Sequence, residues 1–200
     1  MEEKEEIRRA VQTLKEGGVI LYPTDTVWGL GCDATNPEAV ARIFAIKRRP
    51  DSKSLVLLAS DMDMVCRYVR EVPEIAVQLV EVNDKPMTIV YPGALAAESV
   101  EQSDRHLLAA NTVAGDGTVA IRVPLSDFCR RLTAALGRPI VSTSANISGE
   151  PTPSGFDEIS GDVKSAVDCI VDRSFGRGAT GKASSIIKVG LDSSIEIIRK

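Results

Sequence analysis

Cations, hydroxyls and amides form the groups of residues in this sequence that could do chemistry. The segment Lys47–Arg49 is a run of three cations. Ser142, Ser144 and Asn146 follow one another at two-residue spacing. Such side chains hold phosphate and carboxylate groups through hydrogen bonds and charge. They indicate a site that binds anions and works by positioning and by stabilising charge.

The sequence offers few residues for other kinds of catalysis. His106 is the only histidine, which excludes a histidine-based metal site and a catalytic triad. Cys32, Cys66, Cys129 and Cys169 are widely spaced, with no Cys-x-x-Cys pair. They are therefore expected to be buried, reduced thiols of a cytosolic protein. No cluster of Asp or Glu suggests a metal cage, so no metal-binding residues are predicted.

Composition indicates a globular protein with one core. The chain has 200 residues, of which 44% are hydrophobic and 26% are charged. The net charge of -4 argues against a broad basic surface for nucleic acid but leaves room for a local basic groove. No apolar run approaches the ~20 residues that a membrane span needs. We therefore expect a cytoplasmic protein without a signal peptide or a membrane anchor.

Two glycine motifs resemble nucleotide-binding loops, and neither is expected to be one. Gly29–Ala34 has the dinucleotide pattern, but five residues separate it from Pro23, where the preceding strand stops. Gly176–Lys182 nearly matches a P-loop, but Ala183 replaces the hydroxyl that binds Mg²⁺, and the next segment is β-branched. Gly29 and Gly31 are expected instead to allow a turn that brings Thr26 over the site.

The run of cations lies at the end of a predicted helix. Asn36 and Pro37 give the cap and the first-turn proline of a helix start. Arg49 precedes a proline, which disfavours helical geometry and should end the helix. Lys47 lies four residues beyond Ile43, on the apolar stripe. A solvated helix end and a phosphate site are both consistent with this placement.

An apolar strand, predicted over Thr118–Val123, contains an arginine. Alternation places Thr118, Ala120 and Arg122 on one face. An unpaired buried charge is costly, so Arg122 should have an anionic partner. That partner is either an internal carboxylate, in a salt bridge, or the carboxylate of a ligand, in a bidentate clamp.

Hydroxyls also lie at the ends of two other predicted strands. Ser142 and Ser144 share one face at the carboxyl end of the strand predicted over Ile140–Ser144. Polar residues at this position are typical of a crevice at the edge of an α/β sheet. Ser184 and Ser185 open a later strand, where a simple strand-end cap is the alternative reading.

Helices and strands alternate along the chain, which predicts a single α/β domain. The predicted helices are Glu2–Glu16, Asn36–Arg49, Asp61 to about Val69, one from Pro73, Asp127–Leu136 and one near Asp162–Val167. The predicted strands are Val19–Tyr22, Ser54–Ala59, Met87–Tyr91, Thr118–Val123, Ile140–Ser144, Cys169–Asp172, Ser184–Val189 and Ile195–Ile198. The segment His106–Ala114 is either a strand or a mobile flap.

Taken together, the motifs resemble the YrdC family of threonylcarbamoyl-AMP synthases. The matching segments are Tyr22–Gly31, Ile46–Pro50, Asp116–Pro124, Ser142–Gly149 and Ser184–Ile187. They run in order through nearly the whole chain, so together they are more specific than any single motif. The resemblance implies the single-domain form, residues 1–200. It also implies a twisted, mostly mixed α/β sheet, flanked by helices, around a large and locally basic concave cavity.

The resemblance also implies a reaction. L-threonine, bicarbonate and ATP would give threonylcarbamoyl-AMP and pyrophosphate, so the chain would be a nucleotidyltransferase. Any Mg²⁺ would enter mostly through ATP phosphate oxygens and water. The product would feed threonylcarbamoylation of tRNA through a separate transferase complex, and contact with tRNA or other double-stranded RNA is a further expectation.

The family's signature residues are present in this sequence. The Lys-x-Arg and Ser-x-Asn motifs, implied to be catalytic, are Lys47, Arg49, Ser144 and Asn146. Threonine would be held by Thr26, Arg122, Ser142 and Ser184, with Arg122 on the carboxylate. ATP would be held by Arg49, Lys53, Thr118, Ser144, Thr152 and Arg199. Three positions depart from the usual pattern: Trp28 replaces tyrosine, Ser185 replaces threonine, and Lys53 replaces a small amide, which puts that ATP contact in question.

A different class of function fits the same fold. A non-catalytic module for RNA binding, or for ribosome or tRNA maturation, would use the basic cavity for nucleic acid. The intact signature favours the enzyme, and the net charge of -4 weighs against a dedicated RNA binder.

Overall fold

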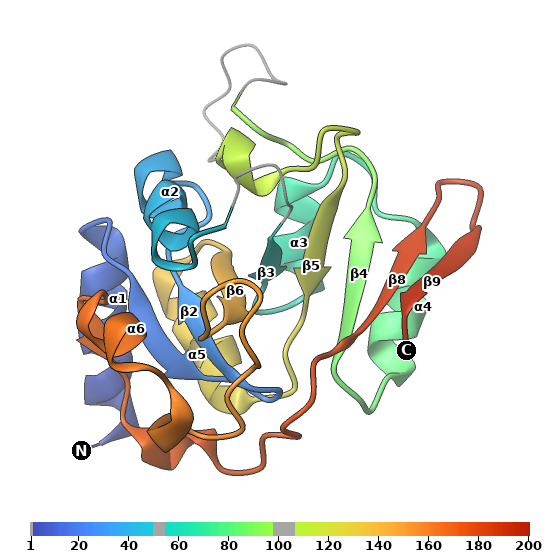
Figure 1. Ribbon diagram of the computed structural model, residues 1–200. Helices are drawn as coiled ribbons and strands as arrows, with labels where there is room; N and C mark the ends of the chain where they lie inside the picture. The colour runs from blue at the N-terminus through green and yellow to red at the C-terminus, as the bar shows by residue number, and fades with distance from the viewer. Residues whose placement is uncertain (1, 50–54, 98–106) are drawn as a thin grey trace.

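A mixed sheet of nine strands runs through the part of the chain that the computed structural model describes, residues 2–49, 55–97 and 107–200 (Figure 1). Its order is β7-β1-β2-β6-β3-β5-β4-β8-β9. The strands are β1 (Ile20–Pro23), β2 (Trp28–Gly31), β3 (Val56–Leu58), β4 (Met87–Tyr91), β5 (Val119–Arg122), β6 (Ile140–Ser144), β7 (Cys169–Ile170), β8 (Ser185–Val189) and β9 (Ile195–Arg199). The pairs β1–β7, β3–β5 and β4–β8 are parallel and the others antiparallel, so the expected mixed sheet is confirmed.

Helices cover both faces of this sheet (Figure 1). They are α1 (Glu3–Lys15), α2 (Pro37–Ile46), α3 (Met62–Tyr68), α4 (Glu74–Val82), α5 (Asp127–Leu136) and α6 (Gly161–Ser165), with short 3₁₀ turns η1 (Ala110–Thr112), η2 (Phe156–Glu158) and η3 (Arg173–Gly176). The cap expected at Asn36 is present, and Asp61 and Ser126 cap their helices in the same way: each of the three accepts a hydrogen bond from a first-turn backbone N–H. Gly137 ends α5 in the left-handed conformation.

Strand alternation divides the buried apolar side chains into two cores. Val19 and Leu21 pack into the larger core, with α2 and α3. Ile20 and Tyr22 point to the opposite face, into a core shared with α1 and α5. The sheet is therefore buried on both faces where α1 and α2 flank it, as the continuous apolar strands require.

The sequence reasoning missed strand β2. It placed Gly29 and Gly31 in a turn, whereas the turn spans only residues 24–27 and both glycines lie in the strand. A Cβ on Gly31 would lie 2.7 Å from Tyr22 Cε1 and 3.0 Å from the Val141 carbonyl oxygen. Gly31 is therefore required for close packing between strands, and the turn role expected of these glycines is wrong.

Two further expectations need correction. For His106–Ala114 a strand or a mobile flap was expected; the described part, from residue 107 onward, forms an isolated bridge at Leu108 and the turn η1, so the strand is wrong and the flap stays a prediction. Thr112 is fully buried there and donates a hydrogen bond to the Ala109 carbonyl oxygen within the turn, and the Ala109 N–H donates to the Ala34 carbonyl oxygen at 2.9 Å, which ties the turn to the core. His106 lies outside the described residues. Cys66 is exposed, whereas the other three cysteines are buried as expected.

No helix in residues 2–49, 55–97 or 107–200 is both long and apolar enough to cross a membrane.

Candidate functional site

A cavity of about 330 Å³ lies against the carboxyl ends of β5 and β6 and the start of β8. Eight of the residues expected at the site line it: Thr26, Arg49, Arg122, Ser142, Ser144, Thr152, Ser184 and Arg199. The register explains why the sheet residues meet. Ser142 lies opposite Val56, and Arg122 opposite Leu58, so both point to the α1 and α5 face of the sheet.

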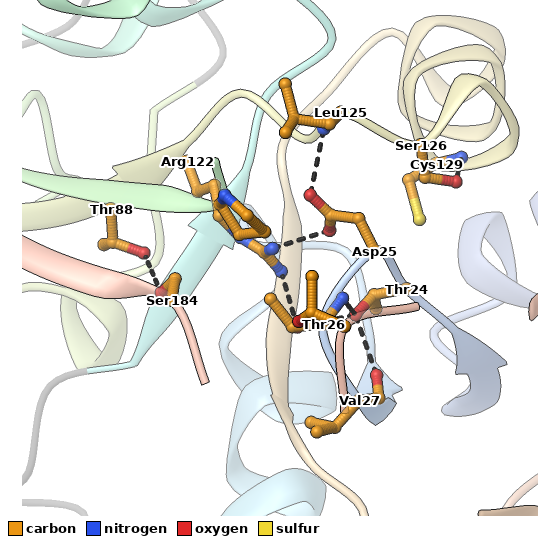
Figure 2. A network of polar contacts seen from close by, with 12 residues as sticks. Thr24, Asp25, Thr26, Val27, Thr88, Arg122, Leu125, Ser126, Cys129 and Ser184 are labelled. Atoms are coloured by element: carbon orange, nitrogen blue, oxygen red, sulfur yellow. Dashed lines mark hydrogen bonds and ion pairs between the residues drawn. The ribbon is translucent and has the colours of Figure 1, made fainter. Parts of the chain in front are cut away.

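The turn between β1 and β2 brings Thr26 to the cavity. Thr24 Oγ1 lies 2.8 Å from Thr26 Oγ1 and 2.7 Å from the Val27 carbonyl oxygen, to which it donates a hydrogen bond (Figure 2). The Thr26 N–H donates back to Thr24 Oγ1 at 3.1 Å. These bonds within the turn fix the Thr26 hydroxyl, whose side chain is buried at the cavity wall.

Arg122 is held by the acidic residue of the same turn. Its Nη1 lies 2.6 Å from Asp25 Oδ1, and its Nη2 donates a hydrogen bond of 3.3 Å to Thr26 Oγ1 (Figure 2). Asp25 is buried, and its second oxygen accepts the Leu125 N–H at 2.9 Å. Of the two partners left open by the sequence, the internal carboxylate is therefore present. Arg122 nevertheless lines the cavity, so its role toward a ligand stays a prediction.

Ser184 enters the cavity from the residue before β8. Its hydroxyl lies 2.8 Å from Thr88 Oγ1, and both side chains are buried (Figure 2). Thr88 on β4 was not identified from the sequence, where it is one hydroxyl within an apolar strand. Its pairing with Ser184 goes beyond the strand-end cap that was the alternative reading, because it anchors the hydroxyl from a neighbouring strand.

Lys47 does not line the cavity but lies directly behind one wall. Its ammonium donates to the carbonyl oxygens of Ser144 at 2.5 Å and Asn146 at 2.7 Å. Its own carbonyl oxygen accepts the Ser148 N–H. Burial, aided by the charge of Arg49, lowers the pKa of Lys47 to about 8. Of the two readings left open by the sequence, the solvated helix end is wrong, because Lys47 is buried and its ammonium contacts backbone.

The end of α2 explains how Lys47 and Arg49 come to the same side. The helix ends at Ile46, earlier than the sequence suggested, in a Schellman motif. Arg48 N–H donates to the Ala45 carbonyl oxygen at 3.1 Å, and Arg49 N–H to that of Phe44 at 3.0 Å. Arg48 occupies the left-handed position of this motif, with φ of 49°. The motif reverses the chain, and Arg49 consequently reaches the cavity wall.

Asn146 shapes the loop after β6. Its Nδ2 donates to the carbonyl oxygens of Ile147 at 3.1 Å and Glu150 at 2.8 Å. Its Oδ1 is buried without a hydrogen-bond partner in the described structure. Together with Lys47, it therefore supports the wall that presents Ser144. The catalytic role that the resemblance implies for both residues stays a prediction.

Comparison with known proteins identifies the family. A family model of Sua5, YciO and YrdC proteins, described as "Telomere recombination", matches residues 12–200. The chain belongs to this family. The resemblance inferred from the motifs is thereby confirmed.

Relatives of similar length in this family carry the name threonylcarbamoyl-AMP synthase. The protein of Halorhodospira halophila is 33% identical over 171 residues, which are 85% of this chain and 84% of that protein. The protein of Xanthomonas euvesicatoria is 32% identical over 197 residues, 97% of each chain. These named relatives support an enzyme.

Solved family members share the fold. Sua5 of P. abyssi, in complex with L-threonine, superposes with a TM-score of 0.81 at 32% identity. The superposition covers 94% of this chain and 52% of Sua5, so the chain spans about half the length of that relative. YciO of E. coli gives a TM-score of 0.77 at 26% identity, covering 100% of this chain and 90% of YciO. The expected α/β fold is confirmed.

The remaining expected site residues of this family member lie at the margins of the cavity or away from it. Thr118 does not line the cavity: its hydroxyl and N–H both donate to Asp116 Oδ1, at 2.7 and 3.1 Å. Thr152 and Arg199 line it from exposed positions, and Arg199 Nε donates to the Ser184 carbonyl oxygen at 2.9 Å. Lys53 lies outside the described residues.

A metal site built by protein residues alone is not found in the described ranges, where no group of three or more His, Cys, Asp or Glu could hold an ion. The Asp25 carboxylate, which holds Arg122, has both oxygens engaged by the Arg122 guanidinium and the Leu125 N–H. The described residues therefore offer no carboxylate cage for a resident Mg²⁺.

The glycine-rich segment after η3 supports the site in another way than a P-loop would. The N–H groups of Thr180 and Gly181 donate to the carbonyl oxygens of Asp25 and Thr26, each at 2.9 Å. The segment therefore fixes the backbone of the Thr26 turn, and it leads into strand β8, not into a helix.

Proposed function

We propose that this chain synthesises threonylcarbamoyl-AMP and pyrophosphate from L-threonine, bicarbonate and ATP. One observation carries the proposal: a single cavity joins a buried cluster of a guanidinium and hydroxyls to a more exposed wall with Arg49 and Arg199. The first suits an amino acid and the second suits phosphates. Relatives that match 85% and 97% of this chain bear the corresponding name.

The buried cluster would hold threonine. Arg122 offers its guanidinium to the carboxylate, because its Nε–H is buried and has no protein partner in the described structure. Thr26, Ser142 and Ser184 present hydroxyls around the same space. Solved Sua5 of P. abyssi, which contains L-threonine, supports this assignment by its similarity.

The more exposed wall would hold ATP. Arg49, Ser144, Thr152 and Arg199 line it. Lys47 and Asn146 support the loop that presents Ser144. Lys53 and Thr118 belong to the expected ATP-binding set as well, although Thr118 does not line the cavity. Mg²⁺ would arrive on the phosphates as part of the substrate, bound mostly by phosphate and water oxygens.

The reaction then follows from the chemistry of the substrates. The uncharged amine of threonine adds to bicarbonate, which gives a carbamate and water. A carbamate oxygen attacks the α-phosphorus, and the bond to the bridging oxygen breaks, so pyrophosphate leaves and the adenylyl group is transferred. Cations at the wall stabilise the charge that develops on the phosphate oxygens. The chain is thus a nucleotidyltransferase, with one domain over residues 1–200.

The product is a mixed anhydride that a tRNA threonylcarbamoyl transferase complex would consume in the cytoplasm. Contact of this chain with tRNA or double-stranded RNA would serve delivery of the product. The site itself needs no nucleic acid for the chemistry.

Pyrophosphate release from ATP tests the proposal. Release should require both L-threonine and bicarbonate, and omission of either should return it to background. If pyrophosphate is not released while RNA binds tightly and in a salt-dependent manner, the chain is an RNA-binding module instead.

A further inference from the structure

The carboxylate of Asp25 joins three segments that are distant in sequence. Oδ1 accepts Arg122 Nη1 at 2.6 Å, and Oδ2 accepts the Leu125 N–H at 2.9 Å (Figure 2). The Asp25 carbonyl oxygen accepts the Thr180 N–H. The side chain is 8% exposed and does not line the cavity. It therefore acts on the site only through the groups that it holds.

These contacts determine the orientation of the Arg122 guanidinium. A free arginine side chain has several rotamers and loses conformational entropy when one of them is fixed. Here Asp25 fixes Nη1 and Thr26 fixes Nη2, so the plane of the group is set. Nε remains buried and without a protein partner in the described ranges. The guanidinium is oriented before any ligand arrives.

We propose that Asp25 is the positioning residue for threonine: by holding Arg122 and the β5–α5 connection with its two oxygens, it orients the guanidinium toward the substrate carboxylate. This inference rests on the proposed function. It assigns Asp25 no contact with the substrate and no proton transfer.

Arguments from charge and from hydrogen-bond geometry give opposite predictions for the affinity of Asp25→Asn for threonine. By charge alone, removal of a negative group beside Arg122 would strengthen the binding of an anionic carboxylate. By position, the amide keeps one acceptor oxygen and places an NH₂ group against either Arg122 or the Leu125 N–H, both of which are donors. The guanidinium would then lose its fixed plane, and binding would weaken.

A second aspartate provides a matched control. Asp33 is also buried, with Oδ2 accepting Arg138 Nη1 at 2.7 Å. Its Oδ1 accepts the Thr35 N–H at 2.9 Å. Asp33 thus repeats the pattern of one arginine and one backbone N–H, with the Thr35 hydroxyl as a further donor at 2.7 Å, but neither Asp33 nor Arg138 lines the cavity. Asp33→Asn should disturb the fold in the same way without affecting threonine.

The experiment is calorimetric titration of L-threonine into the full-length wild type, Asp25→Asn and Asp33→Asn, with the KM for ATP measured in parallel. We expect roughly 10- to 100-fold weaker threonine binding for Asp25→Asn, the effect of one hydrogen bond to a charged group. The KM for ATP should change less than about twofold. Asp33→Asn should bind threonine like the wild type.

Equal threonine affinity in Asp25→Asn and wild type would overturn the inference, and so would equal weakening in Asp33→Asn. If Asp25→Asn does not fold, Asp25→Glu decides by the same criterion, because it keeps both acceptor oxygens but shifts them. A wild type that binds no threonine overturns the proposed function itself.

Discussion

The two ends of the cavity differ in how firmly the fold holds them. At the end assigned to threonine, Thr26, Arg122, Ser142 and Ser184 are 5%, 4%, 9% and 7% exposed. At the end assigned to ATP, Arg49 and Ser144 are half-buried, and Thr152 and Arg199 are exposed. The first group comes from sheet strands or the residues beside them, and three of its four members have hydrogen bonds to other side chains.

This difference indicates that the two ends bind their ligands in different ways. A buried set of donors with fixed orientation can select a small amino acid by shape and hydrogen bonding, because little entropy remains to be lost on binding. An open wall of cations gives weaker and less oriented attraction, which suits a large, highly charged nucleotide. Specificity is therefore expected at the threonine end, and changes at the ATP end should have smaller effects.

The largest effect is expected for Arg122→Ala. Loss of the guanidinium removes the carboxylate partner and leaves Asp25 buried without its cation, so the KM for threonine should rise roughly 30- to 1000-fold, or about 2–4 kcal/mol. The KM for ATP should change little. Steady-state kinetics with each substrate varied in turn measures both values.

Arg138→Ala is the control for Arg122→Ala, since it removes the arginine partner of Asp33 away from the cavity. It should leave the KM for threonine unchanged. An unchanged KM in Arg122→Ala would remove this residue from the carboxylate role.

An intermediate effect, on the KM for ATP, is expected when Lys47 loses its proton. Its pKa is lowered to about 8 by burial, so its charge beside the ATP wall is lost as the pH rises through that value. The KM for ATP should then rise roughly fivefold, or about 1 kcal/mol. Lys47→Met should show a raised KM for ATP without this pH step.

The pH dependence of the folding stability distinguishes loss of the Lys47 charge from unfolding of the protein. The unfolded chain binds the lysine proton more tightly than the folded one, so this group makes the fold more stable as pH rises from about 8 toward the ordinary lysine pKa. Chemical denaturation at matched pH values tests this. A step in the KM for threonine alone would contradict the assignment of Lys47 to the ATP end.

A smaller effect is expected for Arg199→Ala. The residue lies on the exposed edge strand β9, where solvent and salt screen its charge, so the KM for ATP should rise roughly two- to fivefold. The effect should shrink as salt increases. A larger change in the KM for threonine would mean that the hydrogen bond of Arg199 to Ser184 matters more than its charge.

The smallest effect is a change in folding stability, and it concerns the turn that brings Arg49 to the ATP end. Arg48 has φ of 49°, a conformation that costs a non-glycine residue about 1–2 kcal/mol. Arg48→Gly should stabilise the protein by about 0.5–1 kcal/mol after the flexibility of glycine is subtracted. Urea unfolding measures the gain, and both KM values should stay unchanged. A loss of stability would show that the Arg48 side chain has a structural role.

Local signals in the sequence predict much of the fold. The cap Asn36 and the alternation around Ser142 lead to elements that the structure contains. Strand β2 was missed because Gly29 and Gly31 have low strand propensity, and their use in close packing depends on Tyr22 and Val141, which a linear pattern does not bring together.

The site was predictable in its residue types but not in its connections. The need of Arg122 for an anion follows from its apolar strand. That Asp25 supplies the anion depends on the turn after β1, where an acid between two threonines was the one available signal. Likewise, the apolar stripe left open whether Lys47 is solvated or faces a site, because the backbone carbonyl oxygens that bind it cannot be identified from the sequence.

The most direct test of this account is the identity of the product formed from ATP, L-threonine and ¹³C-labelled bicarbonate. Mass spectrometry should reveal threonylcarbamoyl-AMP that carries the label, formed together with pyrophosphate, and Arg122→Ala should form far less at low threonine. Release of pyrophosphate without a labelled adenylate, or an equal yield from Arg122→Ala, would contradict the account.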